Sequence, residues 1–414
     1  MRYRKPQPKH FRPSKRVVII GASVLLVTIG GLSAWAMVKR NNSAYTATND
    51  SNTDANSQSP QATTAPPKPQ TTTITMAASG DQIAHDSLVA FARNNAGYDF
   101  TPLYQNIQPI IKNADIVFCN PETLVAGEQF GISGYPAFNA PTQFAGDMTK
   151  AGKCNVINQA TNHINDKGQQ TINANLANWQ SLQPLAIAGA NKSAADQQAI
   201  SYFTVKDIKF AFLAYADFSN NANFAPYAIN IYHDTMLFDQ QLKQARSNAD
   251  VVIVSMHWGT EDSTTVNQDQ TAFAKRAADL GADILIGTGP HVLQKATHTT
   301  GSSGNSMLTW YSLGNLLSTQ LQLNELTGGI ATWSITKTDT GVKISDVKFH
   351  PTFMSYSWSA DDRAANNLLA RDNLALQLLK NADRDIQSMF PGASAAERLQ
   401  FIKDTIGNEV TVSE

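Results

Sequence analysis

Short apolar runs bounded by turn residues recur along the chain after about residue 72. Six of these runs have the length and the bounding residues of buried strands, at 73–79, 114–120, 154–160, 184–190, 250–256 and 283–289. Between them, apolar residues spaced three and four positions apart predict helices at 99–114, 140–152 and 267–282. This alternation of strands and helices predicts an α/β fold.

Two longer segments have the pattern of antiparallel hairpins. Residues 200–216 turn at a Lys-Asp pair, and residues 329–350 turn at Asp-Thr-Gly. The sheets are therefore expected to be mixed. The charged, Leu- and Ala-rich residues 357–414, interrupted at Pro391, predict a C-terminal helical extension.

The N-terminal part has a different pattern. Residues 17–38 form an uncharged, mostly apolar run of 22 residues, which at 1.5 Å per residue can cross a hydrocarbon core of roughly 30 Å. Seven Lys/Arg precede the run and two follow it, so the positive-inside rule predicts a basic cytoplasmic tail at 1–16 and an extracytoplasmic remainder. A cleaved signal peptide is the alternative, because Ala34 and Ala36 form a small-x-small pair. A transmembrane signal-anchor is favoured, since a signal h-region has only about 7 to 15 residues.

The predicted span is followed by a linker at 39–71. Residues 41–70 contain no Val, Ile, Leu, Met, Phe or Trp, so they cannot bury enough apolar surface to offset their ordering entropy, and we expect disorder. The first 40 residues hold nine Lys/Arg and no acidic residue, which leaves 23 basic against 33 acidic residues in the rest. An acidic body argues against nucleic acid as a partner.

Two cysteines, Cys119 and Cys154, occur in a chain predicted to be exported. An exported location permits a disulfide, and a single bridge is the alternative reading. Two buried free thiols are the slightly preferred expectation. Sequence alone gives no distance between the two residues.

Chemistry-bearing residues follow the predicted strands. Four of the eight histidines stand just past strand ends, where ligands bind in open α/β sheets. One such histidine alone is more often a turn or packing residue, but the set as a whole suits a metal site. The candidate ligands are Asp81, Glu122, Asn162, His163, His257 and His291, with His85 as a further possibility. Nitrogen and oxygen ligands without thiolates predict one or two divalent ions, Mn, Zn or Fe.

Several short motifs occur together and in order. They are GD at 80–81, NPE at 120–122, FNAP at 138–141, NHINDKG at 162–168, HWGTE at 257–261, GPHVLQ at 289–294 and YSLGN at 311–315. Over about residues 72–356 this set resembles the CapA family of bacterial capsule-synthesis proteins, which is linked to poly-γ-glutamate and related to the metallophosphoesterases. The resemblance implies a metallophosphoesterase-like four-layer αββα sandwich with mixed sheets.

The resemblance also implies roles for the residues that match its motifs. Asp81 matches a first-strand aspartate, Glu122 stands where a metal-bridging residue is usual, and the other four candidate ligands match an Asn-His pair and two later histidines. Three departures stand out. The mildest is the NPE at 120–122, where family members commonly have Asn-Leu-Glu. Ile83 occupies the place of a histidine in the first motif, so His85 is out of register. In the last motif Thr288 replaces a histidine, and His291 comes one place late.

Three further residues are expected beside the ligands. Asp166 and Glu261 are placed to orient His163 and His257, although a helix N-cap or a solvated turn carboxylate explains either position equally well. Asn315 matches a family motif, and the alternative is a turn asparagine in the left-handed conformation.

Two functions follow as hypotheses. The first is a membrane-anchored, extracytoplasmic component of capsule or poly-γ-glutamate biosynthesis or export, whose partners are an anionic cell-surface polymer or its synthase complex. The second is a metal-dependent hydrolase of a phosphoester or of a polymer amide bond, with His163 or His291 acting near the leaving group.

Overall fold

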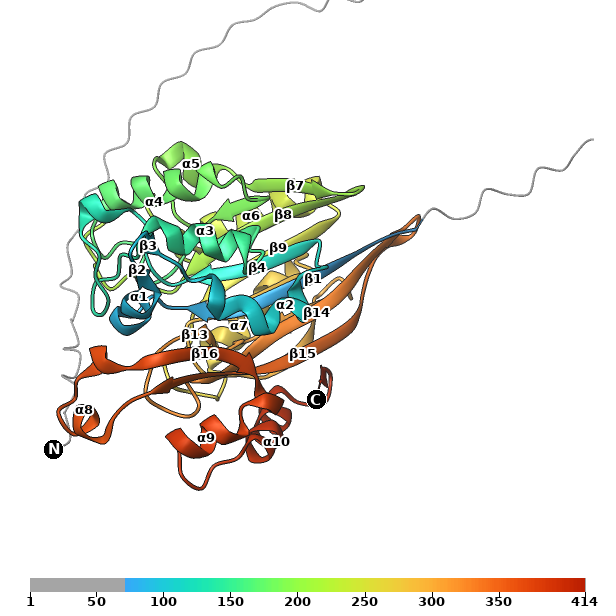
Figure 1. Cartoon of the computed structure of the whole chain (residues 1–414). Coiled ribbons are helices and arrows are strands. Elements are labelled where there is room, and N and C mark those ends of the chain that lie inside the picture. The colour runs from blue at the N-terminus through green and yellow to red at the C-terminus, as the bar shows by residue number, and fades with distance from the viewer. Residues whose placement is uncertain (1–70, 414) are drawn as a thin grey trace, which may run out of the picture. The chain divides into compact units, whose positions relative to one another are not determined.

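A computed structural model describes residues 71–413 (Figure 1). A nine-stranded sheet is built around four parallel strands, β1, β4, β5 and β6, and it continues through antiparallel neighbours from β14 to β16. Its strands are β1 (Thr72–Gln82), β4 (Ile116–Pro121), β5 (Val156–Asn158), β6 (Ala186–Ala188), β13 (Asn315–Leu317), β14 (Thr327–Thr338), β15 (Gly341–Ser357), β16 (Asp372–Leu378) and β17 (Thr411–Val412). We call it the first sheet.

The second sheet has six strands in the order β11-β12-β10-β9-β8-β7. The strands from β8 to β12 along this path are parallel, and an antiparallel strand closes each edge. Its strands are β7 (Ser201–Val205), β8 (Ile208–Ala216), β9 (Val251–His257), β10 (Ile284–Thr288), β11 (Ala296–Thr300) and β12 (Ser306–Trp310). A separate two-stranded ribbon consists of β2 (Arg93–Asn94) and β3 (Gly97–Tyr98).

Helices connect and cover the strands. The α-helices are α1 (Asp86–Ala92), α2 (Gln108–Ile111), α3 (Thr142–Lys150), α4 (Gln169–Ser181), α5 (Ala194–Gln198), α6 (Thr235–Asn248), α7 (Gln268–Asp279), α8 (Ala360–Ala364), α9 (Asp383–Met389) and α10 (Ala395–Ile406). Short 3-10 helices are η1 (Thr101–Ile107), η2 (Glu128–Phe130), η3 (Leu368–Ala370) and η4 (Leu379–Asn381).

The two sheets pack face to face. Phe118 of β4 meets Phe212 of β8 with ring centroids 6.1 Å apart, and Trp310 of β12 meets Trp333 of β14 at 6.5 Å. These side chains belong to one apolar core that both sheets share. Contact between facing rings of this kind is the usual content of a sheet-on-sheet core.

Each sheet also has a face that is covered by helices. On β8, alternate residues such as Leu213 point into a second apolar core with α6 and α7. On β4, Val117 and Cys119 line a small cavity together with Tyr104 and Ile107 of η1. The described residues therefore form helix, sheet, sheet and helix layers, and the predicted mixed α/β sheets are confirmed.

Gly80 of β1 allows this strand to approach closely the residues that precede β13. A Cβ atom at this position would lie 1.8 Å from the carbonyl oxygen of Gly314. The neighbouring amide of Asp81 donates to that same oxygen at 2.9 Å. The absence of a side chain at Gly80 thus fixes where Asp81 lies.

The two cysteines correct an expectation. Cys119 and Cys154 form a disulfide with a Cα–Cα distance of 5.7 Å, so the preference for free thiols is wrong. Cys119 points to the helix side of β4, and Cys154 lies just before β5, which pairs with β4. The pairing of adjacent strands therefore brings together two residues that are 35 positions apart.

The C-terminal residues differ in part from the predicted helical extension. Residues 357–414 include three α-helices, but β16 is a strand that pairs with β15 and extends the first sheet. Figure 1 shows α9 and α10 next to β15. The alternating burial of Leu374 and Leu376 follows the strand period and not a helical one.

The expectations for the N-terminus concern residues outside the described part of the chain. The predicted tail at 1–16, the span at 17–38 and the linker up to residue 70 all lie there. Within residues 71–413, no helix combines the length and the apolar character that a bilayer crossing requires.

Candidate metal centre

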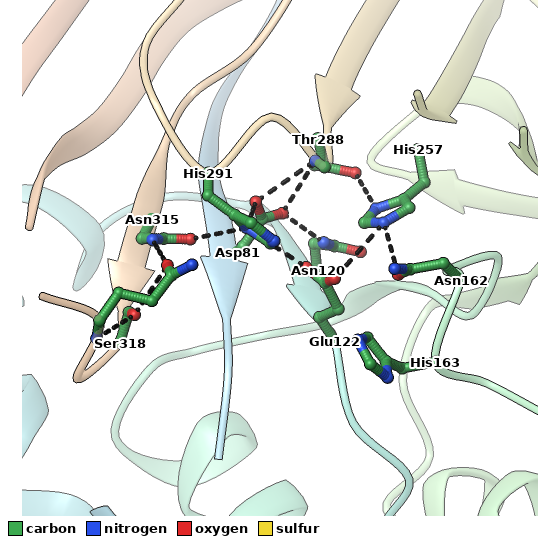
Figure 2. A network of polar contacts seen from close by, with 12 residues as sticks. Asp81, Asn120, Glu122, Asn162, His163, His257, Thr288, His291, Asn315 and Ser318 are labelled. Carbon is green, nitrogen blue, oxygen red and sulfur yellow. Dashed lines mark hydrogen bonds and ion pairs between the residues drawn. The ribbon is translucent and has the colours of Figure 1, made fainter. Parts of the chain in front are cut away.

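Four candidate ligands converge where the two sheets meet (Figure 2). Asp81 lies near the end of β1, Glu122 directly follows β4, His257 ends β9, and His291 follows β10. All four are more than nine-tenths buried. Within each sheet the parallel strands end at a common edge. The packing of the two sheets then brings the ends of β1 and β4 of the first sheet next to those of β9 and β10 of the second.

Three of the four residues are close enough to share an ion, and His291 lies beside two of them. One ligand atom each of Asp81, Glu122 and His257 lies within 4.8 Å of the other two, an arrangement that could hold a metal ion. Nε2 of His257 is 3.5 Å from Oε1 of Glu122. Nδ1 of His291 is 3.0 Å from Oδ2 of Asp81 and 3.7 Å from Oε2 of Glu122. We call these four residues the metal cluster.

One carboxylate oxygen of Glu122 lacks a binding partner. Its Oε2 atom is buried and has no hydrogen-bond partner. A buried carboxylate oxygen without a donor is costly, and a cation is one way to satisfy it. Two carboxylates and two imidazoles form a donor set that fits Zn, Mn or Fe.

Asparagine side chains hold Asp81 in place. Nδ2 of Asn120 donates to Oδ1 of Asp81 at 2.7 Å, and Oδ1 of Asn120 accepts from Nδ2 of Asn158 at 2.6 Å. The amide of Gly289 approaches both carboxylate oxygens of Asp81, at 3.4 and 3.3 Å. Neither Asn120 nor Asn158 was predicted to have a role, although both stand at strand ends and Asn120 belongs to the NPE motif.

His257 is held at both ring nitrogens. Its Nδ1 lies 3.0 Å from the hydroxyl of Thr288, and its Nε2 lies 3.0 Å from Oδ1 of Asn162. The residue that replaces a histidine in the last motif therefore contacts a candidate ligand. Thr288 orients His257. Glu261 is exposed, and its role beside His257 stays a prediction.

His291 sits in a turn of unusual backbone conformation. Its φ is 62°, in the left-handed region that few non-glycine residues occupy, and Gly289 has φ 104°. The turn brings Nδ1 of His291 to 3.2 Å from Oδ1 of Asn315 as well as to Asp81. Asn315 itself begins β13 with a negative φ, which removes the left-handed turn alternative.

The charges of the metal cluster shift its pKa values in opposite directions. Burial lowers the pKa of His291, but the carboxylates of Glu122 and Asp81 outweigh it and raise that pKa to about 10. Burial raises the pKa of Glu122, but His291 and His257 outweigh it and lower that pKa to about 2. At neutral pH the metal-free cluster thus holds an ionised Glu122 beside a protonated His291.

His163 lies beside the metal cluster and not within it. Figure 2 shows it next to Glu122 with no dashed line to the other labelled residues. Its Nδ1 is 2.7 Å from Oδ2 of Asp166, so the predicted contact between the two is present. The ring packs edge-on against Phe138 at 4.7 Å. Asp166 also accepts from the Phe138 amide, at 2.8 Å, which ties the FNAP and NHINDKG motifs together.

His85 is close to the cluster but is turned to other partners. Its Nδ1 accepts from the amide of Thr319 at 3.3 Å, and its ring meets Phe138 at 5.6 Å. Burial, helped by the charge of Arg371, lowers the pKa of His85 to about 3. The ring is therefore neutral, and the structure does not bring it among the four clustered side chains.

Comparison with known families agrees with this arrangement of motifs. A family model described as "Bacterial capsule synthesis protein PGA_cap" matches residues 75–320. The chain belongs to this family. All ten candidate residues of the PGA_cap domain, from Asp81 to Asn315, fall inside the matched range.

Two Bacillus proteins are similar to this PGA_cap chain. The PGA biosynthesis protein CapA of Bacillus subtilis (strain 168) is 28% identical over 253 residues, which are 60% of this chain and 65% of that protein. The capsule biosynthesis protein CapA of Bacillus anthracis is 29% identical over 235 residues, 54% and 55% of the two chains. The match thus spans less than two thirds of either relative.

Solved structures are only distantly similar. A hypothetical protein from Thermus thermophilus aligns with a TM-score of 0.40 at 14% identity, over 66% of this chain and 99% of that one. A 5'-nucleotidase from Candida albicans aligns with a TM-score of 0.35 at 11% identity, over 62% and 47%. The assignment to the PGA_cap family therefore rests on sequence.

Proposed function

We propose that this chain acts in the biosynthesis or export of a bacterial capsule or of poly-γ-glutamate, at the outer face of the cell membrane. Membership of the PGA_cap family and the names of the two Bacillus relatives support a role in this process. The uncharged run at 17–38 and its flanking charges support the anchor and the outward orientation. The partners would be the anionic polymer or its synthase complex.

We propose the metal cluster as the functional site of the domain. The single observation that carries it is the buried Oε2 of Glu122, which has no hydrogen-bond partner and belongs to a carboxylate that lies near His257 at Oε1 and near His291 at Oε2. Asp81, Glu122, His257 and His291 would hold a divalent Zn, Mn or Fe ion. Since the chain after residue 40 is acidic, an anionic polymer would be attracted only near such a centre.

A cellular experiment tests this role. The chromosomal gene is replaced by one that encodes Glu122→Gln, and surface polymer is measured by amount and by chain length. Glu128→Gln is the matched control, because Glu128 is exposed in the neighbouring η2. We expect Glu122→Gln to reduce polymer at least tenfold and Glu128→Gln to leave it unchanged. Normal polymer in a strain that lacks the gene would contradict the role.

A metal-dependent hydrolase is the second candidate, and the position of His163 favours it. A bound divalent ion would supply Lewis acidity at a phosphoester or amide carbonyl. His163 lies beside the cluster with Nδ1 held by Asp166 and Nε2 3.3 Å from Nδ2 of Asn220, so a proton donated to a leaving group would come from Nε2. An imidazole that is fixed in this way beside the metal cluster meets the positional requirement of a general acid.

Turnover measurements separate the two candidates. The full chain, incubated with Mn²⁺ or Zn²⁺, is assayed with a phosphodiester, a phosphomonoester and a γ-linked glutamyl peptide. A hydrolase predicts that His163→Gln lowers kcat at least 100-fold while the metal content stays the same. Equal rates for the wild type and His163→Gln with every substrate would remove the hydrolase and leave the assembly role.

A further inference from the structure

A second group of metal-ligand side chains lies outside the metal cluster. Asp217 directly follows β8, His233 lies just before α6, and Asp269 is in the first turn of α7. One ligand atom of each lies within 4.8 Å of the other two. We propose that these three residues, the second cluster, bind a divalent transition-metal ion that fastens the loop 217–233 to α7. The proposal does not depend on the function proposed above.

The imidazole of His233 is directed between the two carboxylates. Its Nε2 is 2.9 Å from Oδ1 of Asp217 and 3.7 Å from Oδ2 of Asp269. The ring contacts two aromatic side chains, Tyr232 with centroids 4.3 Å apart and Phe273 at 5.3 Å. A ligand ring that is fixed before binding loses little entropy when an ion arrives.

The charges of the second cluster also favour a cation. Within residues 71–413, neither Asp217 nor Asp269 forms an ion pair with a lysine or an arginine. The Tyr232 hydroxyl donates to Oδ2 of Asp269 at 2.6 Å, which fixes this carboxylate but neutralises no charge. Two carboxylates and one imidazole match the donors of Zn²⁺ and Mn²⁺ sites. The half-exposed His233 leaves a path for the ion and room for water ligands.

The loop that carries two of the three ligands borders the metal cluster. The amide of Asp217 donates to the carbonyl of His257 at 2.9 Å, and the amide of Asn220 donates to the carbonyl of Asn162 at 2.9 Å. Nδ2 of Asn220 also lies 3.3 Å from Nε2 of His163. An ion bound by Asp217, His233 and α7 would therefore fix the loop that forms one wall beside His163.

Metal stoichiometry in a background without the first centre tests the proposal. The full chain carrying Glu122→Gln is loaded with Zn²⁺, dialysed and analysed for metal, and Co²⁺ loading adds a visible spectrum. We expect one bound equivalent, which is lost when His233→Gln or Asp217→Asn is added. The matched control is His298→Gln, because His298 is another half-exposed histidine paired with a carboxylate, at 3.1 Å from Glu409. Thermal unfolding confirms that each variant is folded.

The outcomes separate this proposal from the metal cluster. If the Glu122→Gln protein retains metal and the added His233→Gln change removes it, the second cluster binds an ion independently of the metal cluster. If the Glu122→Gln protein binds none, or if His233→Gln and His298→Gln behave alike, the second cluster is an ordinary ion pair and the proposal is overturned. Amide hydrogen exchange adds a readout of the loop. Zn²⁺ should slow exchange at least tenfold over 217–233 in Glu122→Gln and leave it unchanged once His233→Gln is added.

Discussion

The hydroxyl of Thr288 lies 3.0 Å from Nδ1 of His257, so the threonine that replaces a motif histidine positions another candidate ligand. A hydroxyl can donate or accept, and it therefore supports either tautomer of the ring. Nε2 faces two acceptor oxygens, those of Asn162 and Glu122, so in the metal-free protein it is the donor and the Thr288 hydroxyl donates to Nδ1. The departure from the motif thus leaves the orientation of His257 intact.

Removal of this hydroxyl should weaken metal binding. Thr288→Val keeps the shape of the side chain but leaves Nδ1 of His257 without its partner, and loss of such an orienting contact costs about 10 to 100-fold in affinity. Thr288→Ser keeps the hydroxyl and serves as the control. Calorimetric titration with Zn²⁺ measures both. Equal affinities for the two variants would show that Thr288 does not position the ring.

Gly80→Ala should destabilise the fold and displace Asp81. The added Cβ would lie 1.8 Å from the carbonyl oxygen of Gly314, and overpacking of this kind costs about 1 to 3 kcal/mol. The control is Gly146→Ala in α3, where an added Cβ meets nothing within 4 Å. That change should stabilise the helix by up to about 1 kcal/mol. Urea unfolding gives both free energies, and similar values for the two variants would contradict the close approach at Gly80.

The Cys119–Cys154 bridge should contribute measurably to stability. It closes a loop with a sequence separation of 35 residues, for which chain entropy gives about 3 to 4 kcal/mol. Cys119→Ser/Cys154→Ser is compared with the wild type by urea unfolding, with and without a reductant. The reductant should lower the free energy of unfolding of the wild type alone. If it lowers neither protein, the two thiols are not bridged in solution.

Metal affinity should rise with pH. The pKa of His291 is raised to about 10 in the metal-free protein, where Glu122 and Asp81 outweigh the effect of burial. A cation held by His291 must displace this proton, so affinity rises as the pH increases from 6 to 8 and one proton is released per ion. Titrations in buffers of different ionisation enthalpy count the protons. His291→Gln should release about one proton fewer, and an unchanged count would exclude His291 as a ligand.

Much of the fold could be predicted from the pattern of apolar residues along the sequence, because buried strands consist of short apolar runs. The runs at 250–256 and 283–289 became β9 and β10, and both predicted hairpins formed. The proximity of Asp81 to Glu122, and of His257 to His291, was also predictable, since the parallel strands of one sheet end at a common edge. That the two pairs meet depends on how the two sheets pack.

Other features depend on contacts that no local pattern encodes. Asn120 reads as a strand-end residue, and only the pairing of β1 with β4 places it against Asp81. Thr288 was visible only as a departure from a motif, because its partner His257 belongs to another strand. The strand β16 was not predicted because a Leu- and Ala-rich sequence favours helices. Pairing with β15 overrides that preference.

The metal content of the full chain tests the central claim most directly. Wild type, Glu122→Gln and the exposed control Glu128→Gln are loaded with Mn²⁺ or Zn²⁺, dialysed and analysed side by side. The account predicts that the wild type and Glu128→Gln hold equal amounts, and that Glu122→Gln holds about one equivalent less. Equal metal in all three proteins would show that the buried cluster around Glu122 binds no ion.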